Sequence, residues 1–242
     1  MGFYIGRGRK ARRSFGFDEV AIVPGRVTIN PEEVDTTWRL RDIELSVPIL
    51  AAAMDGVVDT RMAIAMSKLG GLAVLNLEGV QTRYEDPSEI LSEIAEAPPE
   101  TATQLVQKLY APPMQDELVG RRIEEIKNGG GVVAVSCTQP QASRFGPIAE
   151  EAGAEVFVVQ STVATIDHIS SAYQTLDIES FIDSMDIPVI VGNCVTYEVA
   201  LDLMEAGADA VLVGVGPGAA CTTRGGLGIG VPQVTATVDC AE

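Results

Sequence analysis

The sequence is short of the residues that build metal centres and disulfide scaffolds. It contains 4 cysteines and 1 histidine in 242 residues. No two cysteines form a CxxC pair, and none lies in a cysteine–histidine cluster, a pattern that disfavours a zinc ribbon or a disulfide framework. Reduced thiols favour a cytoplasmic protein, and we interpret the lone His168 as a structural or surface residue. The cysteines are Cys137, Cys194, Cys221 and Cys240.

Long apolar segments and positive charge are also scarce. No apolar run approaches the ~20 residues that span a membrane, and the opening segment lacks the apolar core of a secretory signal. Lys and Arg number 17 against 34 Asp and Glu, which gives a net charge of −17. Because an acidic surface repels phosphate, we expect neither nucleic acid nor a membrane as a partner.

Basic residues nevertheless cluster at the N-terminus. We interpret this cluster as a tail that pairs with the acidic body of the chain or with a neighbouring subunit, and a nucleic-acid arm is the alternative. The cluster consists of Arg7, Arg9, Lys10, Arg12 and Arg13.

Six short apolar runs are spaced along the chain. They are continuous rather than alternating, which is typical of parallel strands buried on both faces. The predicted strands are 48–55, 71–76, 131–137, 155–161, 187–193 and 210–216. Segments with helical spacing lie between or after them, at 60–70, 87–94, 101–110, 117–130, 143–153, 196–207 and 231–242.

The repeated βα units predict an α/β fold. We expect a (β/α)8 TIM barrel that stops after about six units, with residues 1–45 as an N-terminal arm. Residues 1–242 would then form a single catalytic barrel domain whose C-terminal units are missing. The alternative is an open doubly wound sheet that binds a dinucleotide. Its glycine fingerprint would follow the first strand, whereas the glycine-rich stretch of this chain follows the sixth.

That glycine-rich stretch reads GVGPGAACTTRG and spans residues 214–225. Loops after the strands form the functional face of a barrel, so we expect Cys221 there. Gly216-Pro217-Gly218 favours a tight turn that directs backbone carbonyls or amides at one point. Cys221 is a candidate nucleophile and Thr223 a candidate to position water or a leaving group. The alternative for Cys221, and our interpretation of the other three cysteines, is a small buried apolar residue.

GVGPGAACTTR resembles the catalytic loop of IMP dehydrogenases and GMP reductases, whose pattern is GxGPGSxCTTR. The likeness continues in SFGFDEVAIVP (14–24), in PILAAAMDGVVDTRMAIAMSKLGGLAVLN (48–76), and in IPVIVGNCVT followed by EAGADAVLVG. Residues 77–130 are too few for the regulatory CBS insertion of most IMP dehydrogenases. The Asp-x-Ala-Asn-Gly-Tyr run of GMP reductases is absent after the fourth strand. The sequence is similar to the CBS-less bacterial, cyanobacterial-type IMP-dehydrogenase-related group.

The resemblance implies an NAD-dependent oxidoreductase of purine and GMP biosynthesis that converts IMP to XMP through a covalent thioimidate. It implies that Cys221 is the nucleophile and that Thr223 helps to activate water. It also implies three binding sets and a homo-tetramer or octamer at full length. The sets are Met54, Asn193, Gly218 and Ala219 for the substrate; Gln160, Ser161 and Thr162 for NAD; and the carbonyls of Gly216, Gly218 and Cys221 for K⁺.

Several positions depart from the family pattern. Ala219 replaces a phosphate-contacting serine, and Leu212 replaces a basic residue on the sixth strand. Gln160-Ser161-Thr162 replaces the Asp-Ser-Ser that contacts the nicotinamide ribose. The Asp-Gly-Gly-Ile phosphate motif and the flap with its Arg-Tyr pair would lie beyond Glu242, so we expect a fragment of a longer chain that is inactive alone. Two alternatives stay open: a GMP reductase, and a catalytically weak nucleotide-binding paralogue with a regulatory role.

Overall fold

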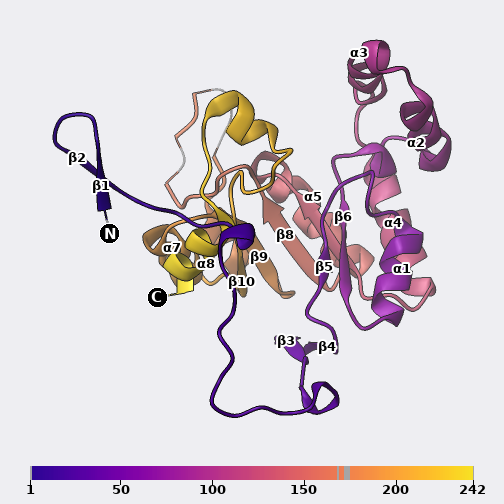
Figure 1. Ribbon diagram of the computed structural model, residues 1–242. Coiled ribbons are helices and arrows are strands. Elements are labelled where there is room, and N and C mark those ends of the chain that lie inside the picture. Colours follow the sequence, from indigo (N-terminus) through magenta and orange to yellow (C-terminus); the bar gives the residue numbers. More distant parts are fainter. Residues whose placement is uncertain (1, 168, 172–174, 242) are drawn as a thin grey trace.

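Six parallel strands form one curled sheet, a half-barrel, in the computed structural model (Figure 1). The structure describes residues 2–167, 169–171 and 175–241, so His168 lies outside the described residues. Each of the six predicted strands is present; five lie within the predicted bounds, and β9 begins two residues later and ends one residue later than predicted. They are β5 (Leu50–Ala51), β6 (Leu72–Asn76), β7 (Ala134–Cys137), β8 (Val156–Gln160), β9 (Val189–Cys194) and β10 (Ala210–Val213).

The strands lie in the sheet in the order of the sequence, β5-β6-β7-β8-β9-β10, and every neighbouring pair is parallel. A doubly wound sheet reverses its strand order at a switch point. The described strands show no such reversal, and this excludes the doubly wound alternative. All six carboxyl ends therefore lie along the same edge of the sheet.

The two faces of the sheet bury different residues. Side chains alternate along a strand, so Val133, Val135 and Phe157 pack outward against the helices. Val74, Val158 and Ile190 point to the concave face, where Leu40 and Leu45 of the N-terminal arm close the base. The continuous apolar runs in the sequence follow from this burial on both faces.

Helices cover the convex face (Figure 1). Four begin at side-chain caps. Asp59 accepts the Met62 N–H at 2.7 Å and Asp86 the Ser88 N–H at 2.9 Å. Asp177 accepts the Ser180 N–H at 3.0 Å and Thr196 the Val199 N–H at 3.4 Å. The short helix α6 (Ile178–Asp183) is not predicted by the sequence pattern. The others are α1 (Thr60–Lys68), α2 (Pro87–Glu96), α3 (Pro99–Leu109), α4 (Asp116–Asn128), α5 (Gln139–Ala152), α7 (Tyr197–Glu205) and α8 (Gln233–Ala241).

Helices α2 and α3 form a hairpin that stands away from the sheet (Figure 1). No residue of α2 is buried, and Leu109 is the buried residue of α3. The third helix of this crossover, α4, returns to the sheet and buries Leu118, Val119 and Ile123. The predicted helices between β6 and β7 are thus confirmed, but only α4 among them belongs to the packed layer.

The N-terminal arm contains two hairpins that the sequence pattern does not predict. The first, β1 (Gly2–Ile5) with β2 (Arg9–Arg12), projects from the body (Figure 1). The second, β3 (Trp38–Leu40) with β4 (Ile43–Leu45), lies under the half-barrel, where Arg41 Nε donates to Asp209 at 2.6 Å. Arg12 forms an ion pair with Asp239 of α8, so the basic cluster does contact the acidic body.

None of the helices in the described part of the chain combines the length and the apolar character that a membrane span requires.

We predict that truncation of Leu45 destabilises the protein although it lies far from the strand ends. Leu45 is 2% exposed against Leu72, Val74 and Ile190. Leu45→Ala should therefore lower the free energy of unfolding in urea by about 2–5 kcal/mol. Leu69→Ala is the matched control, because Leu69 is 72% exposed and its loss should cost less than about 0.5 kcal/mol. Equal effects of the two changes would contradict the placement of the β3–β4 hairpin.

Candidate active site

A cavity of about 440 Å³ opens at the carboxyl ends of the strands. Small-molecule sites have volumes of roughly 300–1,000 Å³. Because the strands are parallel, the segments that follow them meet here although they are far apart in sequence. The lining residues are Ala53, Asn76, Glu78, Ser136, Cys137, Thr138, Gln160, Ser161, Thr162, Asn193, Gly214, Val215, Gly216, Cys221 and Thr223.

Most residues singled out from the sequence line this cavity, and three do not. Cys221, Thr223, Asn193, Gly216 and the segment 160–162 are brought together. The three outside the lining are Met54, which is 57% exposed, Gly218 and Ala219. The exposure of Met54 shows that it is not a core methionine.

Cys221 has an environment that favours its thiolate. Its pKa is lowered first by the backbone N–H of Arg224, then by the backbone N–H of Thr223, and less by the Thr223 hydroxyl. Hydrogen bonds donated to a charged group stabilise the charged form. Since the thiolate is the nucleophilic species of cysteine, the loop itself can activate Cys221.

The other cysteines have the opposite environment. Burial, and then the charge of Glu78, raises the pKa of Cys137 well above its usual range. Burial raises the pKa of Cys194 to about 11 and also raises the pKa of Cys240. Cys137 and Cys194 are buried and Cys240 partly so, which agrees with our interpretation of these three as apolar packing residues.

The loop that carries Cys221 depends on two glycines with positive φ. Gly214 has φ 137° and Gly216 has φ 62°, conformations that residues with a Cβ rarely adopt. A Cβ on Gly216 would also lie 2.7 Å from the carbonyl oxygen of Ile229. The loop is held against the segment before α8, because the Val231 N–H donates to the Val215 carbonyl at 2.9 Å.

Asn193 connects β9 to this loop. Its Nδ2 donates to the Gly214 carbonyl at 2.9 Å. The cap of α7 is Thr196, so the Asn193 side chain braces the base of the cysteine loop instead of capping a helix.

The segment Gln160-Ser161-Thr162 continues the ladder past the end of β8. The Ser161 N–H donates to the Gly192 carbonyl at 2.8 Å, and the Ser161 carbonyl accepts the Asn193 N–H at 3.2 Å. The Ser161 hydroxyl donates to the Val163 carbonyl at 2.6 Å. These bonds fix the backbone and leave the Gln160 amide on the cavity wall.

The backbone carbonyls expected to bind K⁺ are partly engaged within the loop. The Gly218 carbonyl accepts the Cys221 N–H, and the Cys221 carbonyl accepts the Gly225 N–H, both at 3.1 Å. Each carbonyl oxygen keeps a second lone pair. A set of neutral carbonyls suits a weakly hydrated monovalent ion better than Mg²⁺. Among the described residues, no group of three or more His, Cys, Asp or Glu side chains could hold a metal.

Sequence reasoning missed the polar residues at the opposite end of the cavity. Asn76 and Ser136 are paired in register near the ends of β6 and β7, and Glu78 and Thr138 follow them. The signal was present, because each strand sequence changes from apolar to polar at its last residues. In a parallel sheet that change marks the functional edge.

The sheet is curled and parallel, and an activated thiol lies at its strand ends. These two features place the chain among α/β barrel-type proteins, whose sites are built from the loops that follow the strands. The chain belongs to the IMP dehydrogenase / GMP reductase family, because the family described as "IMP dehydrogenase / GMP reductase domain" matches residues 14–242.

Individual relatives agree with this assignment. An uncharacterized oxidoreductase of Mycobacterium tuberculosis is 36% identical over 98% of this chain and 65% of its own length. The inosine-5′-monophosphate dehydrogenase of Borreliella burgdorferi is 31% identical over 96% of this chain and 60% of its own. A crystal structure of an IMP dehydrogenase/GMP reductase-like protein from Corynebacterium glutamicum matches with a TM-score of 0.91 and 33% identity, over 99% of this chain and 64% of that one. This chain therefore spans less than two thirds of the length of these relatives.

We predict that Cys221 reacts first with iodoacetamide. Its lowered pKa makes the thiolate available at lower pH than for an ordinary thiol, whereas the pKa values of Cys137, Cys194 and Cys240 are raised. The labelling rate of Cys221 should rise with pH and reach half of its maximum below the usual thiol range. Peptide mass spectrometry across a pH series measures each site, and equal labelling of all four cysteines would contradict the prediction.

Proposed function

We propose that this chain carries the catalytic cysteine of a purine-nucleotide oxidoreductase that converts IMP to XMP with NAD⁺ and water. The observation that supports this most directly is Cys221, with a lowered thiol pKa, on the wall of the strand-end cavity. The family and the uncharacterized oxidoreductases among its relatives support the reaction class.

We propose the following chemistry for Cys221. Its thiolate attacks C2 of the purine and forms an S–C2 bond, and C2 loses its hydrogen as hydride. NAD⁺, when bound, supplies the acceptor for that hydride. Water then adds to C2 and displaces the sulfur, which gives XMP and restores the thiol. Thr223, whose hydroxyl contacts the same sulfur, would help to orient the water.

The remaining site residues take the roles that the family resemblance implies. Asn193 and the cysteine loop would hold the nucleotide, with Met54, Gly218 and Ala219 at its edge. Gln160, Ser161 and Thr162 would hold the dinucleotide, because they present an amide and hydroxyls to the same cavity. The carbonyls of Gly216, Gly218 and Cys221 would hold K⁺.

The larger assembly is also part of the proposal. The six strands would be six of the eight in a (β/α)8 barrel, since β5 and β10 are the edges of the sheet and the chain covers 64% of its structural match. The full-length protein would act in the cytoplasm as a homo-tetramer or octamer, with no nucleic-acid partner.

A GMP reductase is the second candidate. Gln160 departs from the acidic position of both groups, and the Cys221 thiol on the cavity wall serves GMP reduction as well as IMP oxidation. In that reaction the same thiol would attack C2 of GMP, ammonia would leave, and NADPH would return a hydride to C2.

We predict that the full-length protein forms NADH from IMP and NAD⁺, and that Cys221→Ala lowers this rate by at least about 10³-fold because the nucleophile is lost. Cys240→Ala, on α8 outside the cavity, should retain the activity and serves as the matched control. The NADH absorbance measures the forward reaction, and chromatography of IMP formed from GMP and NADPH measures the alternative. Full activity of Cys221→Ala in both assays would exclude both candidates.

We also predict that K⁺ activates turnover. The cation would hold the loop in the shape that presents Cys221, so its effect should appear in the rate and not in the melting temperature. The full-length protein should be faster in KCl than in NaCl or a bulky ammonium chloride at the same ionic strength. If the rates in KCl and in the bulky salt are identical, the loop keeps its shape through its own turn geometry and the cation role is wrong.

A further inference from the structure

The strand-end cavity has two chemically different ends. Cys221 and Thr223 follow β10 at one end, and Glu78 and Thr138 follow β6 and β7 toward the other. Strands β8 and β9 lie between them in the sheet. A ligand held against the thiol therefore leaves the Glu78 end of the cavity for a second ligand.

Glu78 is the only carboxylate among the described residues that line the cavity, and no lysine or arginine is among them. The other polar groups of the lining are hydroxyls and amides, from Ser136, Thr138, Ser161, Thr162, Thr223, Asn76, Gln160 and Asn193. Without a cationic partner on the cavity wall, the carboxylate can accept hydrogen bonds from hydroxyls and disfavours a phosphate at the same place.

The carboxylate is held in a fixed position. It accepts the Thr138 N–H through one oxygen and the Thr138 hydroxyl, at 3.1 Å, through the other. The Glu78 N–H donates to Asn76 Oδ1 at 3.0 Å, and Arg83 donates to the Glu78 carbonyl at 3.0 Å. Each carboxylate oxygen keeps further acceptor capacity.

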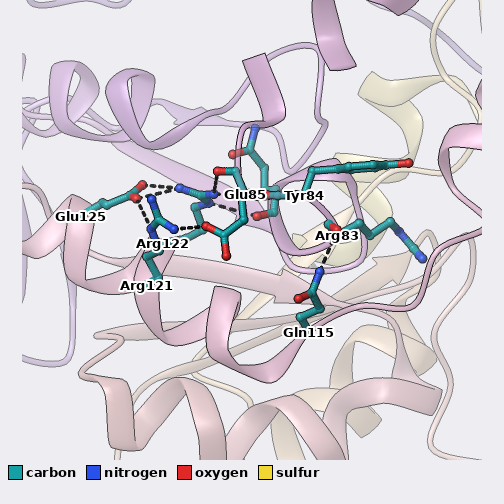
Figure 2. A network of polar contacts seen from close by, with 8 residues as sticks. Arg83, Tyr84, Glu85, Gln115, Arg121, Arg122 and Glu125 are labelled. Carbon is teal, nitrogen blue, oxygen red and sulfur yellow. Dashed lines mark hydrogen bonds and ion pairs between the residues drawn. The ribbon is translucent and has the colours of Figure 1, made fainter. Parts of the chain in front are cut away.

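The segment that carries Glu78, residues 77–85 (the β6 loop), is itself clamped from two sides. Arg122 of α4 is 4% exposed and donates to the carbonyls of Gln81, Tyr84 and Glu85 at 3.0, 3.2 and 2.7 Å. Figure 2 shows this network around Arg122, with Glu125 on its other side. From the sheet side, Asp55 accepts the Val80 N–H at 2.8 Å. Charge-assisted bonds of this kind pre-organise a binding group.

We propose that Glu78 forms a second subsite, which binds ribose hydroxyls of the nicotinamide dinucleotide. A carboxylate that accepts from ribose hydroxyls is a recurrent way of binding such cofactors. Gln160, at the end of β8, offers an amide and no carboxylate to the cavity. Glu78 supplies a carboxylate from the loop after β6, two strands away in the sheet. This inference rests on the proposed function, because it takes the second ligand to be the dinucleotide.

The test is a binding experiment on the full-length protein by calorimetry. The ligands are NAD⁺ and two analogues, each lacking the 2′-hydroxyl of one ribose. Wild-type protein should bind one of the analogues at least about 10-fold more weakly than NAD⁺, as expected for loss of a hydrogen bond to a charged group. Glu78→Gln and Glu78→Ala should bind NAD⁺ about 10-fold more weakly and should no longer distinguish it from that analogue. Glu89→Gln, on the exposed α2, is the control and should behave as wild type.

The loss of discrimination separates binding from a structural role, because a loosened loop would weaken NAD⁺ and both analogues alike. Protection of Cys221 from iodoacetamide by IMP should be unchanged in Glu78→Gln, which shows that the thiol end is intact. Two results would show that the subsite is wrong while the nucleotide site stands, provided that IMP still protects Cys221. In the first, the Glu78 variants bind NAD⁺ and distinguish it from the analogue as wild type does. In the second, wild type does not bind NAD⁺. If no purine nucleotide protects Cys221 in wild type, the proposed function itself fails.

Discussion

The structure depends on one geometric constraint, the parallel alignment of six strands in sequence order. Parallel alignment sends every carboxyl end to the same edge, and alternation assigns neighbouring side chains to the helix layer or to the concave interior. Near the base both positions are apolar, as in Val74 beside Leu75. At the last residues of β6, β7 and β8 the inward position becomes Asn76, Ser136 and Gln160. The alternation of side chains thus builds the apolar core along the strands and the polar wall of the cavity at the strand ends.

Activation of the thiol is local and does not depend on the overall charge. A chain with net charge −17 creates a potential that opposes a thiolate, but salt screens that potential over roughly 8 Å. The amides of Thr223 and Arg224 act at hydrogen-bond distance, where screening has little effect. Backbone dipoles can therefore activate Cys221 in an acidic protein without a neighbouring lysine or arginine.

The sequence allowed the strands and the Cys221 loop to be predicted because both are local signals: continuous apolar runs, and glycines around a cysteine. It did not allow the β3–β4 hairpin to be predicted, because Leu40 and Leu45 pack against strand residues that are distant in sequence, at the base of the concave face. Glu78 was missed although the change from apolar to polar residues at the end of β6 marks the functional edge of the sheet. Its position on the cavity wall also depends on contacts with Thr138, Arg83 and Arg122, which no short stretch of sequence reveals. Met54, which a family motif suggested as a site residue, lies outside the cavity lining, so its contact with the nucleotide stays a prediction.

The α2–α3 hairpin has a consequence for how this fold can change over evolution. The hairpin leaves the sheet after the β6 loop, and the chain returns through α4, whose Arg122 secures that loop. Between the two attachment points α2 buries no residue, and Leu109, near the end of the hairpin, is the buried residue of α3. Lengthening a surface excursion costs little, because the entropy of closing a loop grows only with the logarithm of its length. The segment between α2 and α3 is therefore a position where a whole domain can be gained or lost, while the residues that set the cavity stay in place.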